Sequence, residues 1–346
     1  MTNKLKHGAW YLKDLEKIPK KNISVFSIFS CGGGSTMGYK LAGCTVKGCV
    51  EIDEKLMTMY KENHNPQFSY KMAIQDFNKL PISDIPDELK NLDILDGSPP
   101  CSSFSTAGVR DKKWGKEHFF REGQEVQILD DLFFHFIETA KILKPKIVIA
   151  ENVKGLITGK AKGYVKEIFL AFDKAGYNCQ LFLFNAAKMG VPQSRARVFF
   201  IASRKDLKFP KLKFEFNEPN ISYFDAMKGI NAKQERQKLR NALLGLWRAT
   251  KAGHNLGTAH PKGNFFSFYK INPKVPVNCI TANGPTHMLW DKPYYLSKQE
   301  LVRLQTFPED YNFLDQQTQY VTGMSVPPFM IERIVASVIE QWSLST

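Results

Sequence analysis

The chain has 346 residues, of which 43% are hydrophobic, a composition typical of a soluble globular protein with one large core and room for a second lobe. Lysine and arginine total 48 against 34 acidic residues, so the net charge is +14 and a polyanionic partner, foremost nucleic acid, is favoured. The N-terminus has no apolar signal core, no later run is long enough to span a membrane, and the six cysteines form neither a CxxC pair nor a His/Cys cluster with zinc spacing. These features predict a cytoplasmic protein with free thiols, no metal and no membrane partner.

Short apolar runs alternate with amphipathic segments from residue 23 to about residue 202. Strands are predicted at 23–30, 45–53, 92–97, 146–153, 179–185 and 197–202. Helices are predicted at 127–143, where Ile128, Leu132, Phe136 and Ala140 have helical spacing, and at 165–175. This alternation predicts an α/β fold with a doubly wound, mostly parallel sheet. After residue 202 the sequence is basic and interleaved with aromatic residues, which indicates a second, smaller lobe.

The first predicted strand runs into a glycine-rich turn, "FSIFSCGGGSTMG". Gly32, Gly33 and Gly34 allow close backbone approach to a ligand, although the stretch does not match GxGxxG. Glu51 ends the next strand, where an acid can accept hydrogen bonds from ribose hydroxyl groups. Together they indicate an adenosine-containing cofactor at the carboxyl edge of the sheet, with a purely structural turn as the alternative.

Three further segments carry candidate chemistry. In "DGSPPCSSFS", two prolines fix the backbone before Cys101, which suits a rigidly presented nucleophile and equally an ordinary turn. Glu151 follows the apolar run "IVIA", so it is either a partly desolvated proton donor or a loop acid that caps a helix. Arg195 and Arg197 alternate along "QSRAR", so their guanidinium groups share a face, either directed at one site or forming a surface stripe.

Taken together, the order and spacing of these segments resemble the DNA (cytosine-5) methyltransferases of bacterial restriction–modification systems. "FSIFSCGGG", "VEID", "GSPPCSSFS", "ENVKG" and "QSRAR" are similar to the family's successive motifs, and "LSKQELVRLQTFPEDY" and "GMSVPPFMIERI" are similar to its last two. The match runs from about Val25 to Ile334 and leaves 204–275 unmatched, where the family carries its variable target-recognition domain. The resemblance implies a Rossmann-like S-adenosylmethionine-dependent catalytic domain at 1–203, completed by 322–346. It also implies a target-recognition domain at 204–290 across a basic cleft and a return segment at 291–321.

The resemblance also implies the reaction. Cys101, behind Pro100, would attack C6 of a cytosine that has been flipped out of the duplex, which makes C5 nucleophilic toward the methyl group of S-adenosylmethionine. Glu151 would hydrogen-bond N3 and the exocyclic amine, Arg197 would contact O2, and Arg195 would brace the site and the thiolate loop.

Cofactor contacts are implied for Phe29, Gly32, Gly33, Gly34, Glu51, Ile52, Ile74, Ser98, Pro100, Leu132, Ser325 and Val326. DNA contacts are implied or expected for Ser105, Arg110, Lys112, Lys113, Trp114, Gln193, Arg248, His254, Asn255, Lys262 and Thr281. The stretch from Ser102 to about Gln124 is interpreted as an active-site loop that makes phosphate contacts. Within the small lobe, "RATKAGHNLGTAHPKGNFF" is the expected base-reading segment.

Departures from the family pattern gather on the cofactor side. They are Ser27 in place of a frequent aspartate, Cys31 in place of glycine, Ile52 in place of an aromatic residue, Ala73 in place of an aspartate and Met324 in place of an asparagine. Ser102 also replaces the usual glutamine after the nucleophile. These changes predict a less polar cofactor pocket and weaker or partner-assisted binding of S-adenosylmethionine.

Two other functions stay open at this point. An RNA (tRNA) cytosine-5 methyltransferase shares the same motifs, and a non-catalytic relative could bind DNA as a regulator. The favoured function implies double-stranded DNA as a partner, a protein that acts as a monomer, and room for a cognate restriction endonuclease of the same site.

Overall fold

The apolar runs of the first 200 residues assemble into one large sheet. The computed structural model describes residues 8–100, 117–118, 127–128, 131–158, 162–230 and 236–344. These residues fall into two compact units. The large unit takes the described residues of Ile18–Phe184, Ala196–Phe214 and Ile334–Thr346, and the small unit takes those of Met1–Lys17, Asn185–Arg195 and Glu215–Arg333.

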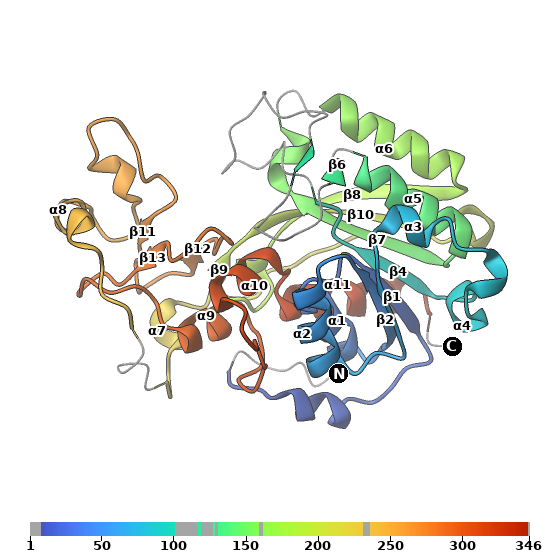
Figure 1. Cartoon of the computed structure of the whole chain (residues 1–346), viewed down its shortest axis with the longest axis horizontal. Helices are drawn as coiled ribbons and strands as arrows, with labels where there is room; N and C mark the ends of the chain where they lie inside the picture. Colours follow the sequence, from blue (N-terminus) through green and yellow to red (C-terminus); the bar gives the residue numbers. More distant parts are fainter. Residues whose placement is uncertain are drawn as a thin grey trace. The chain divides into compact units, whose positions relative to one another are not determined.

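The large unit is a seven-stranded sheet in the order β3-β2-β1-β4-β7-β10-β8 (Figure 1). Its strands are β1 Ser24–Ile28, β2 Thr45–Glu51, β3 Phe68–Lys71, β4 Ile94–Gly97, β7 Ile147–Val153, β8 Tyr177–Asn185 and β10 Ala196–Arg204. The neighbouring pairs among β3, β2, β1, β4 and β7 are parallel, and β10 is antiparallel to β7. The predicted mostly parallel α/β fold is therefore confirmed.

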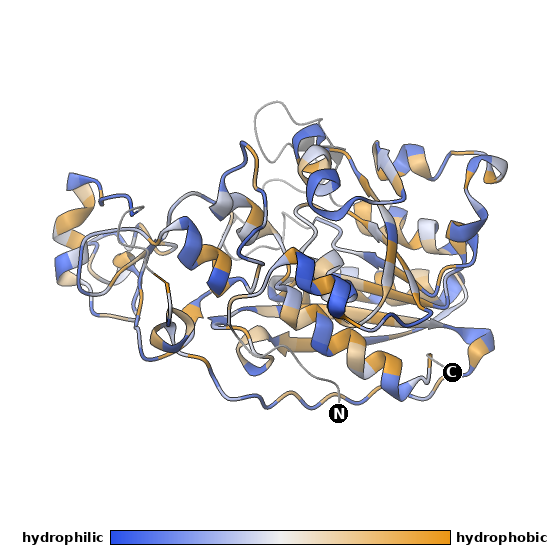
Figure 2. Ribbon diagram, turned by 90° about the horizontal axis from the view of Figure 1, so that it is seen from below, coloured by the Kyte–Doolittle hydropathy of each residue, from blue (hydrophilic) through white to orange (hydrophobic). Residues whose placement is uncertain are grey.

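Helices cover both faces of this sheet. They are α1 Gly34–Leu41, α2 Glu54–His64, α3 Ile74–Phe77, α4 Asp87–Lys90, α5 Leu132–Leu143 and α6 Lys162–Lys174. One face packs Phe26, Leu95 and Val148 against α3, α5 and α6 in a single hydrophobic cluster. On the other face, Cys49 packs against Met57 and Tyr60 of α2. In Figure 2 the strands are mainly orange and most helices are orange on one side only, as a two-faced core requires.

The structure shortens one predicted helix and adds a strand that was not predicted. Gln127–Ile128 forms the short strand β6, paired with β5 Glu117–His118, and α5 begins only at Leu132. The helical spacing of apolar residues therefore extended the predicted helix too far toward the N-terminus. The strand β3 was not predicted, because "FSYK" is too short and too polar to give an apolar run.

The small unit contains short strands and helices. They are β9 Gln193–Ser194, α7 Tyr223–Ala226, α8 Asn241–Ala249, β11 Tyr269–Lys270, β12 Val277–Asn278, β13 His287–Met288, α9 Lys298–Leu304 and α10 Thr318–Met324. The last helix, α11 Pro328–Gln341, belongs to this unit up to Arg333 and to the large unit from Ile334.

The bounds of the two units differ from the ranges predicted for the domains. The described part of the N-terminal segment, the stretch 185–195 and the return segment 291–321 all belong to the small unit. The composition of these stretches does not show that they belong to the small unit. They join it through contacts with residues far along the chain. One example is Trp10, whose indole nitrogen donates to Thr306 O at 3.1 Å.

The part of the chain that the structure describes contains no helix both long and apolar enough to cross a membrane.

Candidate active site

Four candidate segments of the large unit follow the carboxyl ends of neighbouring parallel strands. β1 leads into the glycine-rich turn, β2 ends at Glu51, β4 leads into Ser98 and Pro100, and β7 carries Glu151 near its end. Because these strands are parallel, their carboxyl ends lie at one edge of the sheet. Ligands of open α/β sheets bind at this edge.

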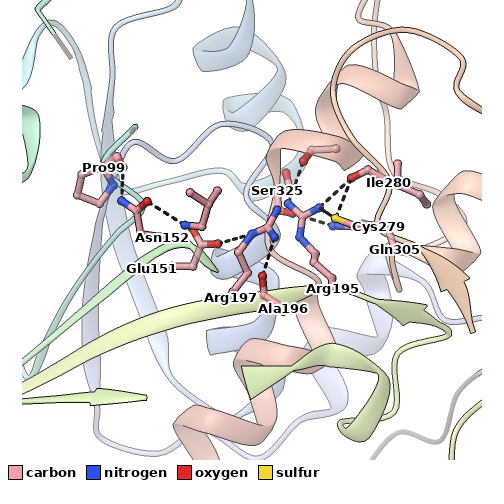
Figure 3. A network of polar contacts seen from close by, with 12 residues as sticks. Pro99, Glu151, Asn152, Arg195, Ala196, Arg197, Cys279, Ile280, Gln305 and Ser325 are labelled. Carbon is pink, nitrogen blue, oxygen red and sulfur yellow. Dashed lines mark hydrogen bonds and ion pairs between the residues drawn. The ribbon is translucent and has the colours of Figure 1, made fainter. Parts of the chain in front are cut away.

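A buried ion pair joins Glu151 and Arg197. Arg197 Nε lies 2.9 Å from Glu151 Oε1, and the side chains of Arg197 and Glu151 are only 14% and 11% exposed (Figure 3). The antiparallel register pairs Arg197 with Val153, two residues from Glu151, so both side chains project from the same face. A carboxyl group held in this way is fixed in orientation and largely removed from water. The strand registers thus assemble the pair that the sequence predicted as catalytic.

Asn152 fixes the start of the segment that leads to Cys101. Its amide nitrogen donates to Pro99 O at 3.0 Å, and its amide oxygen accepts from the backbone N–H of Val153 at 2.8 Å. Asn152 was not among the predicted site residues. The available signal was an amide inside an otherwise apolar strand, where burial requires a hydrogen-bond partner.

The glycine-rich turn requires glycine at Gly33. Its φ is +70°, and a Cβ atom there would lie 2.1 Å from Nε2 of the buried His64. Phe29 and Cys31 also have positive φ, at 59° and 45°. Non-glycine residues are strained in this region, so the turn is held in an uncommon shape by its surroundings.

Glu51 connects this turn to the end of β2. Its carboxylate accepts the backbone N–H of Cys31 at 2.9 Å and that of Asp53 at 3.1 Å. Burial raises the pKa of Glu51 above its ordinary value. A carboxylate has about four acceptor positions, so Glu51 has acceptor capacity left for hydroxyl donors.

A second buried acid, Asp96, lies on β4 and was not among the predicted site residues. Ser27 Oγ donates to it at 2.8 Å and Tyr39 Oη donates at 3.1 Å. Burial raises the pKa of Asp96 to about 7, and the nearby charge of Glu151 adds to the shift. Ser27 and Asp96 are register partners on β1 and β4. The family motif often carries an aspartate at position 27, where this chain has Ser27. Asp96 supplies a carboxyl group beside that position from the neighbouring strand β4, which argues against a less polar cofactor pocket here. An acid inside the strand "LDILDG" was the signal that could have found it.

The partners of Arg195 and Arg197 lie in different units. Arg195 is buried in the small unit, where it donates to Ile280 O and Gly323 O at 2.9 Å each and contacts Cys279 Sγ at 3.4 Å (Figure 3). Arg195 therefore braces backbone of the small unit at residues 280 and 323, and its bracing of the active site and of the thiolate loop stays a prediction. The interpretation of the two arginines as a surface stripe is wrong, because both are buried or nearly so.

Gln193 is also buried in the small unit. Its amide nitrogen donates to Gln305 Oε1 at 2.7 Å and its amide oxygen accepts from Ile280 N–H at 3.0 Å. Gln305 in turn donates to Ser325 O at 2.7 Å. Both ends of the Gln193 amide thus serve internal contacts in this structure, and its DNA contact stays a prediction.

The remaining predicted residues differ in exposure. Ile74 and Leu132 are part of the hydrophobic core of the large unit, and Phe29 packs against it. In the small unit, Ser325 and Val326 are buried. Arg248, His254 and Lys262 are exposed, and Asn255 and Thr281 are partly buried.

Several predicted site residues lie outside the described residues. They are Cys101, Ser105, Arg110, Lys112, Lys113 and Trp114. The described side chains include no group of three or more His, Cys, Asp or Glu residues that could hold a metal ion.

The sheet order and the glycine-rich turn after β1 are typical of doubly wound α/β proteins that bind a ligand at the carboxyl edge of the sheet. The model of the C-5 cytosine-specific DNA methylase family matches residues 23–340, and the chain belongs to that family.

Two relatives and one solved structure show how far the similarity extends. The chain is 28% identical over 332 residues to the type II methyltransferase M.FnuDI of Fusobacterium nucleatum, covering 84% of this chain and 86% of the relative. It is 26% identical over 341 residues to M1.HphI of Haemophilus parahaemolyticus, covering 92% and 87%. The fold matches a protein described as a DNA modification methyltransferase encoded within an E. coli prophage, with a TM-score of 0.69, 18% identity and coverage of 93% and 100%.

The family uses S-adenosylmethionine as methyl donor and DNA as substrate. The residues of the large unit fit this cofactor. Glu51 accepts two backbone N–H groups and offers its remaining acceptor capacity to ribose hydroxyls. In the small unit, the buried hydroxyl of Ser325 has no hydrogen-bond partner among the described residues.

Proposed function

We propose that this DNA cytosine-5 methyltransferase modifies one cytosine in a short double-stranded sequence, as the methyltransferase of a type II restriction–modification pair. The buried Glu151–Arg197 pair supports this most directly, because it fixes the orientation of the carboxyl group that the proposed reaction uses to hold the pyrimidine edge. The names of the two relatives support the restriction–modification setting. The proposal includes action as a monomer in the cytoplasm, beside a cognate endonuclease.

In the proposed reaction, the Cys101 thiolate adds to C6 of the flipped cytosine and the ring electrons move toward C5. Glu151 holds a proton at N3 and accepts a hydrogen bond from the exocyclic amine, which stabilises the adduct. Arg197 keeps Glu151 in orientation and contacts O2. Bound S-adenosylmethionine supplies an electrophilic methyl group. After C5 has accepted it, a base removes the C5 proton and Cys101 leaves C6, which restores the aromatic ring.

Further assignments belong to the same proposal. Glu51 and the turn at Gly33 hold the cofactor, and the target-recognition domain at 204–290 reads the DNA. Most of that range lies in the small unit. The predicted weak binding of S-adenosylmethionine is tested by calorimetry without DNA. A dissociation constant in the low micromolar range or tighter would exclude weak binding. It corresponds to a binding free energy of about −8 kcal/mol or one that is more negative.

The first experiment is conversion-based sequencing of plasmid DNA treated with the protein and S-adenosylmethionine. Protected cytosines in one recurring context, absent with Cys101→Ser, are expected and would reveal the target sequence. Protection of transcribed RNA but not of DNA would favour the tRNA alternative. Sequence-specific DNA binding without any protection would favour the regulator.

A further inference from the structure

The small unit contains a narrow antiparallel ribbon between residues 253 and 270, which we call the aromatic finger. Lys270 N–H donates to His254 O at 3.0 Å, Gly253 N–H donates to Lys270 O at 2.7 Å, and Leu256 N–H donates to Phe268 O at 2.8 Å. The intervening residues 257–267 form a tip that projects beyond β11 and α8 (Figure 1). The finger is thus a loop on a defined hydrogen-bonded base.

Side-chain contacts fix the shape of this tip. His260 Nδ1 accepts the backbone N–H groups of Lys262 and Asn264, each at 3.2 Å. A Cβ atom at Gly257 would lie 2.8 Å from Gly263 O, so the two strands of the loop approach closely. A loop held by its own contacts loses little conformational entropy when it binds a partner.

This ordered tip exposes two adjacent aromatic rings. Phe266 is 54% exposed and Phe265 is 37% exposed. Phe265 also has a φ of +65°, a conformation that costs free energy for a bulky residue. Edge contacts with His260 at 5.4 Å and Phe268 at 5.6 Å between ring centroids support its ring. The finger therefore holds strained backbone in an arrangement that leaves apolar surface in water.

The charge around the finger identifies the partner. From residue 236 to residue 290 the sequence contains no aspartate or glutamate, whereas Lys or Arg occurs at 236, 238, 240, 248, 251, 262, 270 and 274. Lys262 is exposed on the tip itself, and Lys251 and His254 are exposed at its base. Arg236 pairs with Glu300 and Lys270 is buried against Trp247, but Lys251 and Lys262 are exposed near the aromatic rings. Aromatic rings beside exposed cations suit nucleic acid, because phosphates neutralise the cations and every base offers a face for stacking.

We propose that the aromatic finger enters DNA, with Phe266 stacking on a base at an opened step while Lys262 contacts a neighbouring phosphate. Apolar side chains inserted at base steps unstack them in this way. The inference rests on the proposed function only in taking double-stranded DNA as the partner. It assigns the aromatic residues of the small unit to DNA binding beside the polar ones expected from the sequence.

The test compares the full-length variants Phe266→Ala and Lys262→Ala with the wild type. Fluorescence anisotropy gives the affinity for the target duplex over a series of salt concentrations. Phe266→Ala is expected to weaken binding about 10- to 100-fold with an unchanged salt slope, because no charge is lost. Lys262→Ala is expected to lower the salt slope by about one unit. Permanganate oxidation should detect an unstacked thymine near the target site with the wild type and not with Phe266→Ala.

Phe224→Ala is the matched control, since Phe224 is 48% exposed in the same unit but lies on α7, outside the finger. It should bind DNA like the wild type, and thermal unfolding shows whether each variant is folded. Unchanged affinity of folded Phe266→Ala would overturn the inference, whatever else the rings contact. A wild type that binds DNA through Phe266 but methylates no cytosine would instead overturn the proposed function.

Discussion

In the buried Glu151–Arg197 ion pair, each residue neutralises the charge of the other. Both side chains are nearly buried, so removing one partner leaves an uncompensated charge away from water. Arg197→Met is expected to lower the free energy of unfolding by about 3 kcal/mol, and adding Glu151→Gln should recover most of that loss. Urea denaturation measures both changes.

Arg204→Met is the control for this prediction. The side chains of Arg204 and Asp206 are 33% and 60% exposed, so this more exposed ion pair should contribute less to stability. If the double variant were as unstable as Arg197→Met, the arginine would act through packing rather than through its charge. Glu151→Gln alone should lower kcat by about 10² to 10⁴ because it removes the proton held at N3.

Asp96 predicts a pH dependence of stability. Its pKa is raised from an ordinary value near 3.8 to about 7, chiefly by burial and further by Glu151, while hydrogen bonds from Ser27 and Tyr39 oppose the rise. Between these pH values the folded protein holds a proton that the unfolded chain has released, so the Asp96 contribution to stability falls as pH rises through this interval. The loss is about 1.4 kcal/mol per pH unit at most.

Asp96→Asn removes this titration. Urea denaturation between pH 5 and pH 8 should therefore show a flatter stability profile for the variant than for the wild type. Parallel profiles would mean that Asp96 stays ionised in the folded protein throughout this range.

At the scale of elements, six strands of the large sheet were predictable because each is a short apolar run. The start of α5 was not predictable, because its N-cap residue Asp131 makes no side-chain hydrogen bond that would mark the boundary. The strand β3 was not predictable either, because it forms through pairing with β2. The candidate catalytic pair was predictable from motif order. The contacts of Asn152 and Asp96 were not, because they join strands that are far apart in sequence.

The N-terminal segment also acquires a role only through contacts. Trp10 is buried in the small unit, stacks on Phe329 with 6.3 Å between ring centroids, and accepts the Glu309 N–H at its backbone oxygen. Trp10→Ala is expected to cost about 3–5 kcal/mol of unfolding free energy, because it leaves a cavity and an unpaired Thr306 carbonyl. Tyr11→Ala, at a more exposed position, should change little. Equal stability of the two variants, measured by denaturation, would show that the segment is not part of the folded unit.

At the scale of the whole molecule, the net charge of +14 predicts how binding responds to salt. Each phosphate that a lysine or arginine neutralises releases counterions, so the logarithm of DNA affinity should fall by about 0.9 per contact for each tenfold rise in salt. With six or more contacts, affinity for duplex DNA should drop about 10³-fold or more between 50 and 200 mM salt. S-adenosylhomocysteine has no net charge near pH 7, so its affinity should change only a few-fold over the same range.

The two salt titrations show whether the basic residues contribute to binding of DNA, of the cofactor product, or of both. A steep DNA curve beside a flat S-adenosylhomocysteine curve means that the basic surface serves DNA while the buried groups around Glu51 serve the cofactor. A flat DNA curve would mean that the excess lysine and arginine do not contact phosphates, and that affinity comes from stacking and base contacts alone. The stretch 236–290 has no acidic residue and carries eight of the 48 lysine and arginine residues. Each lysine that contacts a phosphate contributes about one unit to the slope of log affinity against log salt, so replacing Lys251 and Lys262 together should lower this slope by about two units.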